Sequence, residues 1–179
     1  AKILAAVLGG SACIPQWLVV HPEWLEIFDS KTLKRTRRLA GLQRELNQLL
    51  KRQKDVDALA VIRRFKQREM VRIATRDLAR LADVSEITAE LSHVADISLG
   101  AMLNICHERL RTKIGSPWHF GGDGKWRETP FSLIGLGKLG GHELNYSSDV
   151  DVMLVYEDEG HVFKDRPKGR GTSSNLSSH

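Results

Sequence analysis

The chain has 179 residues, 41% of them hydrophobic and 27% charged, which is typical of a globular protein with about one domain. No apolar run reaches the roughly 18 residues that span a bilayer, and the chain does not begin with a signal-peptide pattern, so we expect a cytoplasmic protein without a membrane segment. The formal net charge is +5, but segment 34–80 alone contains fifteen Lys or Arg and five Asp or Glu, a net charge of +10.

A basic segment of this kind can mark a nucleic-acid or anion partner, although solvated helix faces are the commoner explanation. Only one aromatic residue, Phe65, lies within it, and surfaces that stack bases need more. We therefore do not expect nucleic acid as a partner. Cys13 and Cys106 lie far apart and form no CxxC or Cys/His cluster, so we predict two reduced, buried thiols.

The first two-thirds of the chain has helical periodicity. Pro22 suits the first turn of a helix over "HPEWLEIF", and the leucines of "GLQRELNQLLKRQ" recur at helical spacing. A longer helix is predicted over 59–82, and Glu69 and Asp77 fall on its apolar face. Buried carboxylates need Arg, Lys or hydrogen-bonding partners, so we expect a structural ion-pair network there rather than a catalytic role.

Another helix begins after a short break at residues 82–86. Asp83 stands three residues before Glu86, which is the spacing of a capping box, and the apolar pattern then continues to Leu110. Segment 115–130, "GSPWHFGGDGKWRETP", is rich in glycine and proline and is the best candidate for a domain boundary.

Beyond this boundary the pattern changes to short β-strands, "FSLIGLG" and "DVDVMLVY", joined by a glycine-rich connection. The sequence therefore predicts an α+β protein: a helical region over 1–120, followed over 121–179 by a partial second domain. That domain would contain the glycine-rich turn, an Asp-x-Asp strand and a disordered polar tail.

Two carboxylates, Asp149 and Asp151, stand at the start of the second apolar strand. Residues i and i+2 of a strand face the same side, so these side chains would project together while Val150, Val152 and Leu154 enter a core. Neighbouring carboxylates repel each other unless a cation lies between them. Mg²⁺ suits such a pair because it prefers oxygen ligands and bridges carboxylates to substrate phosphates.

The glycines before the aspartates fit the same chemistry. Gly140 and Gly141 would let the backbone approach a polyphosphate closely, and Lys138 could supply a positive charge. "GLGKLGG" lacks the GxGxxG order of a dinucleotide-binding turn. The pattern favours nucleotidyl transfer, while a glycine-rich hairpin with two solvated aspartates stays open as an alternative.

The full string "GLGKLGGHELNYSSDVDVMLVY" resembles the signature of the glutamine synthetase adenylyltransferase/adenylyl-removing enzymes, a branch of the polymerase-β-like nucleotidyltransferases. Segment 62–96 is similar to the region preceding that signature, and the resemblance covers about 22–156. It implies the start of a polymerase-β-like sheet after the helices. In that family one catalytic half attaches AMP to a tyrosine of glutamine synthetase and the other removes it by phosphorolysis, releasing ADP; Asn145 makes this chain more similar to the N-terminal, adenylyl-removing half.

The resemblance also implies roles for individual residues. Asp149 and Asp151 would be metal ligands for Mg²⁺, Gly140 and Gly141 would cradle phosphate, and Lys138 and Ser148 would support nucleotide binding. Glu143 and Asn145 would position the connection. ATP or ADP and phosphate would be substrates, and the partners would be glutamine synthetase and a nitrogen-signalling regulatory protein.

One departure from the family pattern concerns a third carboxylate, which the family has on a later strand in a stretch similar to "DLRLRP". Nothing like it follows Tyr156, so we expect an enzyme fragment with little or no activity of its own. Two alternatives stay open: a nucleotidyltransferase that acts on RNA or a small molecule, and a docking or regulatory module without activity.

Overall fold

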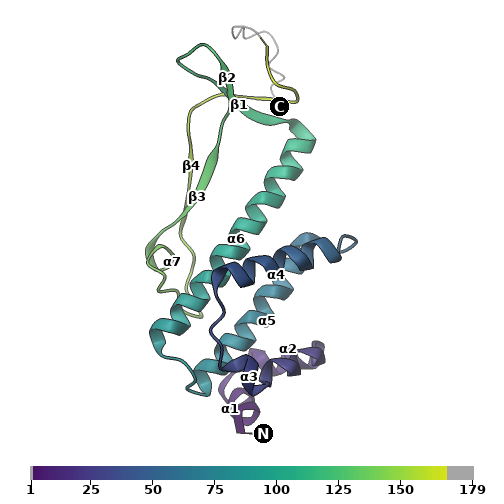
Figure 1. Cartoon of the computed structure of the whole chain (residues 1–179), viewed down its shortest axis with the longest axis vertical. Coiled ribbons are helices and arrows are strands. Elements are labelled where there is room, and N and C mark those ends of the chain that lie inside the picture. The colour runs from purple at the N-terminus through teal and green to yellow at the C-terminus, as the bar shows by residue number, and fades with distance from the viewer. Residues whose placement is uncertain (1, 169–179) are drawn as a thin grey trace. The chain divides into compact units, whose positions relative to one another are not determined.

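The computed structural model describes residues 2–168, and the predicted disordered tail lies outside them. These residues form two compact units (Figure 1). The first comprises the described residues up to Met102 together with Gly135–Asp151, and the second comprises Leu103–Ile134 with the described residues from Val152. Helices with small sheets confirm the α+β class. The units differ from the predicted division at residue 120, since the glycine-rich turn belongs to the first unit.

Helices build most of the first unit, and α4 lies beside α5 (Figure 1). Pro22 occupies the first turn of its helix as predicted, although that helix is of the 3-10 type. The last helix continues into the second unit. The elements are α1 (Lys2–Gly10), α2 (Cys13–Val20), η1 (Pro22–Phe28), α3 (Ser30–Leu33), α4 (Leu39–Arg52), α5 (Ala58–Leu78) and α6 (Val84–Ile114).

The helices of the first unit enclose a hydrophobic core. One hydrophobic cluster joins α1, α2, η1, α3 and α5, and its buried members are Val7, Ile14, Leu18, Trp24, Ile27, Leu33 and Val71. The predicted cap of α6 is confirmed, because a carboxylate oxygen of Asp83 accepts a hydrogen bond from the amide of Glu86 at 2.8 Å. None of the described helices alone is long and apolar enough to cross a membrane, although α1 and α2, bent by 115° at their junction, pass that test of length and composition together.

Buried charges link α5 to α6 and to the segment before α4. Glu69 is completely buried and accepts hydrogen bonds from Nε of Arg72 at 2.8 Å and from Nη1 of Arg37 at 2.6 Å. Glu90 accepts from Nη2 of Arg72 at 2.9 Å and from Nη1 of Arg76 at 3.2 Å. The prediction of a structural ion-pair network around Glu69 is therefore confirmed. We call these five side chains the buried ion network.

The two cysteines are free, but both are exposed, so the prediction of buried thiols is wrong. Cys13 is the first residue of α2, where Ile14 and Leu18 occupy the buried positions of that helix. Cys106 lies in the last part of α6, where most side chains are exposed.

The second unit contains short strands where the sequence indicated only a boundary. Segment 115–130 forms a hairpin in which β1 (Ser116–Phe120) pairs antiparallel with β2 (Trp126–Glu128). Strand β5 (His161–Phe163), which the sequence did not predict, pairs with the other edge of β1. The glycines that suggested a loop lie in the hairpin turn, where Gly124 has φ +76°.

The two predicted strands form a separate sheet, β3 (Phe131–Gly135) with β4 (Val152–Tyr156). All five residues of β4 are exposed. The prediction that Val150, Val152 and Leu154 enter a core is therefore wrong: they are 39%, 41% and 62% exposed. In the part of the chain that the structure describes, this sheet has two strands, and burial of a strand's apolar face needs a further layer.

Candidate functional site

The glycine-rich turn and the second aspartate lie together. The turn forms the short helix α7 (Gly137–Gly140) directly after β3. The amide of Leu136 donates a hydrogen bond to the carbonyl of Asp151 at 2.9 Å, so the end of β3 is held beside the start of β4. Gly137 has φ +55°, and a Cβ added there would lie 3.9 Å from Oδ2 of Asp151. The carboxylate therefore faces the first residue of the turn.

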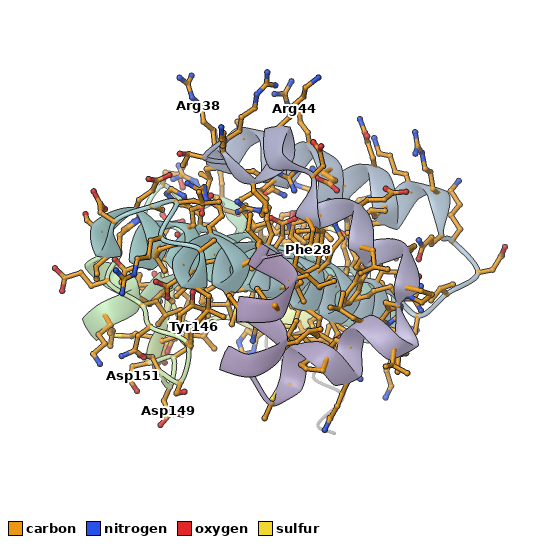
Figure 2. All side chains as sticks on the ribbon, turned by 90° about the horizontal axis from the view of Figure 1, so that it is seen from below. Phe28, Arg38, Arg44, Tyr146, Asp149 and Asp151 are labelled. Atoms are coloured by element: carbon orange, nitrogen blue, oxygen red, sulfur yellow. The ribbon has the colours of Figure 1, made fainter. Side chains whose placement is uncertain are left out.

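Asp149 and Asp151 come just before β4 rather than within it, because the strand begins at Val152. The period of a regular strand therefore does not fix the direction of the Asp149 side chain. Both side chains are exposed, and Figure 2 shows both pointing outward from the ribbon. Both carboxylates are thus open to solvent, and Asp151 is the one that the structure places beside the turn.

The structure explains why glycine is needed in the turn, a reason that the sequence did not reveal. A Cβ at Gly140 would lie 2.6 Å from the carbonyl oxygen of Gly135, a backbone contact that excludes a side chain. The amides of Gly140 and Gly141 already donate to the carbonyls of Leu136 and Gly137, at 3.2 and 3.0 Å. In this conformation, close packing inside the turn explains why residue 140 is glycine. The amide hydrogens of Gly140 and Gly141 are both used in hydrogen bonds within the turn.

The other predicted residues flank this turn. Lys138 is exposed, and its carbonyl accepts a hydrogen bond from the amide of Glu143 at 2.7 Å. The hydroxyl of Ser148 donates to the side-chain oxygen of Asn145, and the amide of Ser148 donates to the carbonyl of Asn145 at 3.3 Å. Asn145 thus contacts Ser148 through its side chain, whereas Glu143 contributes only its backbone amide here, and the positioning roles of both stay predictions.

Sequence reasoning missed the residues that attach this segment to the helices. The amide of Leu144 donates to the hydroxyl of Ser92 in α6 at 3.1 Å. The hydroxyl of Tyr146 donates to Oδ2 of Asp77 in α5 at 3.1 Å. Asp77 was expected to meet Lys or Arg, and it meets a tyrosine hydroxyl instead. Burial raises the pKa of Tyr146, and the negative charge of Asp77 raises it further.

The donor set suits a hard cation with few protein ligands. Among residues 2–168, the structure brings no three His, Cys, Asp or Glu side chains together as a metal site. Two exposed carboxylates, Asp149 and Asp151, can still hold Mg²⁺, since this ion keeps several waters and commonly uses one or two carboxylates with substrate phosphates. The chemistry of these two donors is compatible with Mg²⁺.

A separate hollow of about 720 Å³ lies within the second unit, among the end of α6, β3, β4 and β5. Its lining includes apolar side chains such as Leu103, Leu110 and Leu154. None of the predicted site residues lines it.

Comparison with known proteins places these features in a family. Residues 1–174 match the family model described as glutamate-ammonia ligase adenylyltransferase. Bifunctional glutamine synthetase adenylyltransferase/adenylyl-removing enzymes are similar to the chain over much of its length. The enzyme of Shewanella frigidimarina is 31% identical over 175 residues, 96% of this chain and 17% of the relative. Those of Nitrosococcus oceani and Shewanella loihica are 39% and 29% identical, over 59% and 89% of this chain and 11% and 16% of the relatives.

The chain thus spans less than a fifth of the length of these relatives. The match to the family model nevertheless includes the helices, the glycine-rich turn and both aspartates. The chain belongs to the glutamate-ammonia ligase adenylyltransferase family.

Proposed function

We propose that this chain is part of a Mg²⁺-dependent nucleotidyltransferase that removes AMP from a tyrosine of glutamine synthetase by phosphorolysis. The supporting observation is the position of the Asp151 carboxylate beside Gly137, with Asp149 two residues before it. A glycine-rich turn followed by two exposed carboxylates suits phosphate chemistry with a bridging cation, because Mg²⁺ is commonly held by one or two carboxylates together with substrate phosphates. Asn145, in the resemblance to the adenylyl-removing half, favours removal over attachment.

In the proposed reaction an oxygen of inorganic phosphate attacks the phosphorus of the tyrosine-linked AMP. The bond between that phosphorus and the tyrosine oxygen breaks, ADP forms, and the tyrosine oxygen takes a proton. Mg²⁺ held by Asp149 and Asp151 would neutralise phosphate charge when bound. Lys138, exposed on α7, would contribute a second positive charge to the phosphates.

The protein residues around the aspartates have supporting tasks. Gly140 keeps α7 packed against the end of β3, and the absence of side chains at Gly140 and Gly141 would let a phosphate approach the backbone of the turn. Ser148, which donates to Asn145, closes the segment just before Asp149. We propose that the complete site has the polymerase-β-like sheet, of which β3 and β4 are the first strands, and that ATP or ADP is its nucleotide.

The proposed role places the protein in the cytoplasm, in the regulation of nitrogen assimilation. The relatives' names include glutamine synthetase, which we propose as the protein substrate of the complete enzyme. A nitrogen-signalling regulatory protein is the proposed second partner.

Metal binding tests the proposal directly in this chain. Electron paramagnetic resonance of Mn²⁺, a probe for the Mg²⁺ site, should show binding that strengthens in the presence of ADP. Asp149→Asn and Asp151→Asn should each weaken it by at least about tenfold, because each removes one of two charged ligands. Asp55→Asn, an exposed carboxylate of the same unit, is the control. Equal Mn²⁺ affinity in all four proteins would refute the proposed site.

A docking role is the second candidate, and the direction of the charged side chains favours it. The acidic residues Glu45 and Glu69 bind arginines of the first unit, while many Lys and Arg side chains remain exposed. Figure 2 shows Arg38 and Arg44 pointing away from the ribbon. An acidic protein surface would complement the charge of these exposed Lys and Arg side chains. Capture of glutamine synthetase by the chain, lost at high salt and unaffected by Asp149→Asn with Asp151→Asn, would support docking.

The alternative of an RNA substrate is tested with the same preparation. In segment 34–80 the one aromatic side chain, Phe65, is buried, so that segment offers bases no ring to stack on. We expect no RNA binding whose affinity falls steeply as salt rises. Such binding would favour the RNA-directed alternative.

A further inference from the structure

The loop that carries both aspartates has little regular structure of its own. After α7 the backbone runs through turns from residue 141 to β4 at Val152. A segment without a ladder of backbone hydrogen bonds samples many conformations unless other parts of the protein hold it. The amide of Leu136 holds the end of the loop at the carbonyl of Asp151, so the position of Asp149 between these points depends on contacts that the loop makes elsewhere.

One such contact is with a buried serine. Ser92 is completely buried in α6; its hydroxyl donates to the carbonyl of Thr88 at 2.8 Å and accepts from the amide of Leu144 at 3.1 Å. Leu144 itself is only 7% exposed. The middle of the loop is thus attached to α6 by a backbone hydrogen bond and a buried side chain.

A second contact lies two residues farther along the loop. Tyr146 donates its hydroxyl hydrogen to Oδ2 of Asp77 in α5 at 3.1 Å. A tyrosine hydroxyl is protonated at neutral pH, and although Tyr146 is 41% exposed, its partial burial and the Asp77 charge raise its pKa further and favour this donor role. Figure 2 shows Tyr146 and the two aspartates on the same loop.

The two helices that provide these contacts are themselves joined by the buried ion network. Asp77 follows Arg76 directly, and Ser92 lies two residues after Glu90. Nη1 of Arg76 donates to Oε2 of Glu90 at 3.2 Å, and both side chains are about 1% exposed. The spacing of the two attachment points is therefore fixed by the core of the first unit.

We propose that Asp77 and Ser92 are positioning residues, which hold the loop through Tyr146 and Leu144 and thereby fix the place of Asp149 and Asp151. The effect on the aspartates rests on the proposed function, whereas the attachment of the loop does not. These residues lie 69 and 52 positions away in sequence from the loop residues they contact.

Hydrogen exchange of the full chain tests the attachment. Tyr146→Phe removes one hydroxyl, and Ser92→Ala removes the acceptor for Leu144; each should make loop amides exchange about fivefold faster, the effect of one lost hydrogen bond. Amides of α5 and α6 should keep their rates. The controls are Tyr156→Phe, an exposed tyrosine of β4, and Ser85→Ala, an exposed serine of α6. Unchanged loop exchange, or equal acceleration throughout the helices, would overturn the proposal.

Mn²⁺ affinity tests the consequence for the aspartates. Tyr146→Phe and Asp77→Ala should weaken Mn²⁺ binding severalfold, while Asp77→Asn, which keeps an oxygen acceptor, should retain most of it. Faster loop exchange with unchanged Mn²⁺ affinity would overturn the positioning of the aspartates. If the unsubstituted chain bound no Mn²⁺, the proposed metal site would fail, and the exchange result would still decide the attachment.

Discussion

Glu90 of α6 accepts a hydrogen bond from Nη2 of Arg72 in α5 at 2.9 Å, although the two side chains are only 1% and 2% exposed. The same carboxylate also accepts from Nη1 of Arg76 and from the backbone amide of Arg37. A buried ion is tolerated only when its partners replace the lost water. Glu90 therefore joins α5, α6 and the segment before α4 through one carboxylate.

Removing this carboxylate should be severely destabilising. Glu90→Ala removes the carboxylate that the buried guanidinium groups of Arg72 and Arg76 bind. We expect this change to lower the free energy of unfolding by about 3–5 kcal/mol. Urea denaturation followed by circular dichroism measures the change. Glu108→Ala breaks an exposed pair with Arg111, 3.5 Å apart, and should cost at most about 0.5 kcal/mol. Similar losses in both variants would contradict the role assigned to Glu90.

The acid stability of the first unit should depend on Glu45. Burial alone would raise the pKa of this carboxyl, but hydrogen bonds and charges of Arg37 and Arg68 lower it below its ordinary value of 4.5. A folded-state pKa below the unfolded value contributes stability that is complete above about pH 4.5 and is lost as the pH falls through the folded pKa.

Urea titrations at several pH values test this dependence. Between neutral pH and about pH 5, Glu45→Gln should be less stable than the unsubstituted chain by a constant amount. The difference should shrink below pH 4.5, because the carboxyl then becomes protonated in both states. A difference that stays constant down to pH 3 would show that the charge of Glu45 is not its cause.

Gly140 should not tolerate a side chain. The Cβ of an alanine would lie 2.6 Å from the carbonyl oxygen of Gly135, so the end of β3 or α7 would have to move. We expect Gly140→Ala to destabilise the chain by about 1–3 kcal/mol, the usual cost of overpacking. Gly100→Ala in α6 meets nothing within 4 Å and should stabilise by about 0.5–1 kcal/mol. Thermal denaturation of both variants compares them, and equal effects would argue against the contact.

Periodicity was a reliable guide to the helices because local spacing determines which face is buried. It predicted α4, α5 and α6, the Asp83 cap and the ion-pair network of Glu69. The hairpin of β1 and β2 escaped prediction because its strands are short and its glycines resemble a linker. The Trp126 ring lies 5.3 Å from Phe120 within the hairpin and 5.3 Å from Phe163 of β5, a tertiary contact that the local sequence does not show.

In the candidate site, too, local sequence predicts some features, while others depend on contacts between residues far apart in the chain. The motif itself predicted which residues to examine; the structure places Asp151 beside Gly137, and the binding roles of these residues stay predictions. The bond from Tyr146 to Asp77 joins residues 69 positions apart, and no local pattern indicates such a pair. The exposure of β4 was also missed, because an apolar alternation shows which side chains suit burial and not whether another layer covers them.

The uncovered strand should make the chain associate with itself. Val152, Leu154 and Tyr156 are 41%, 62% and 57% exposed along one strand, and such contiguous apolar edges promote contacts between molecules. Sedimentation velocity should show association that increases with protein concentration and that Leu154→Glu reduces. Val84→Glu changes an isolated apolar residue, 76% exposed at the start of α6, and should leave association unchanged. Equal behaviour of the two variants would exclude β4 as the cause.

The 179-residue chain should release little or no ADP from adenylylated glutamine synthetase in the presence of phosphate and Mg²⁺. Phosphoryl transfer with bound cations needs carboxylates that fix both the ion and the reacting groups, and among residues 2–168 no three His, Cys, Asp or Glu side chains come together as a metal site. The family resemblance implies a third carboxylate on a later strand, in a stretch similar to "DLRLRP", which does not occur in this sequence. A coupled assay for ADP measures the rate, and the Asp149→Asn chain provides the background. Robust turnover above that background would show that two carboxylates suffice and that the implied third is dispensable.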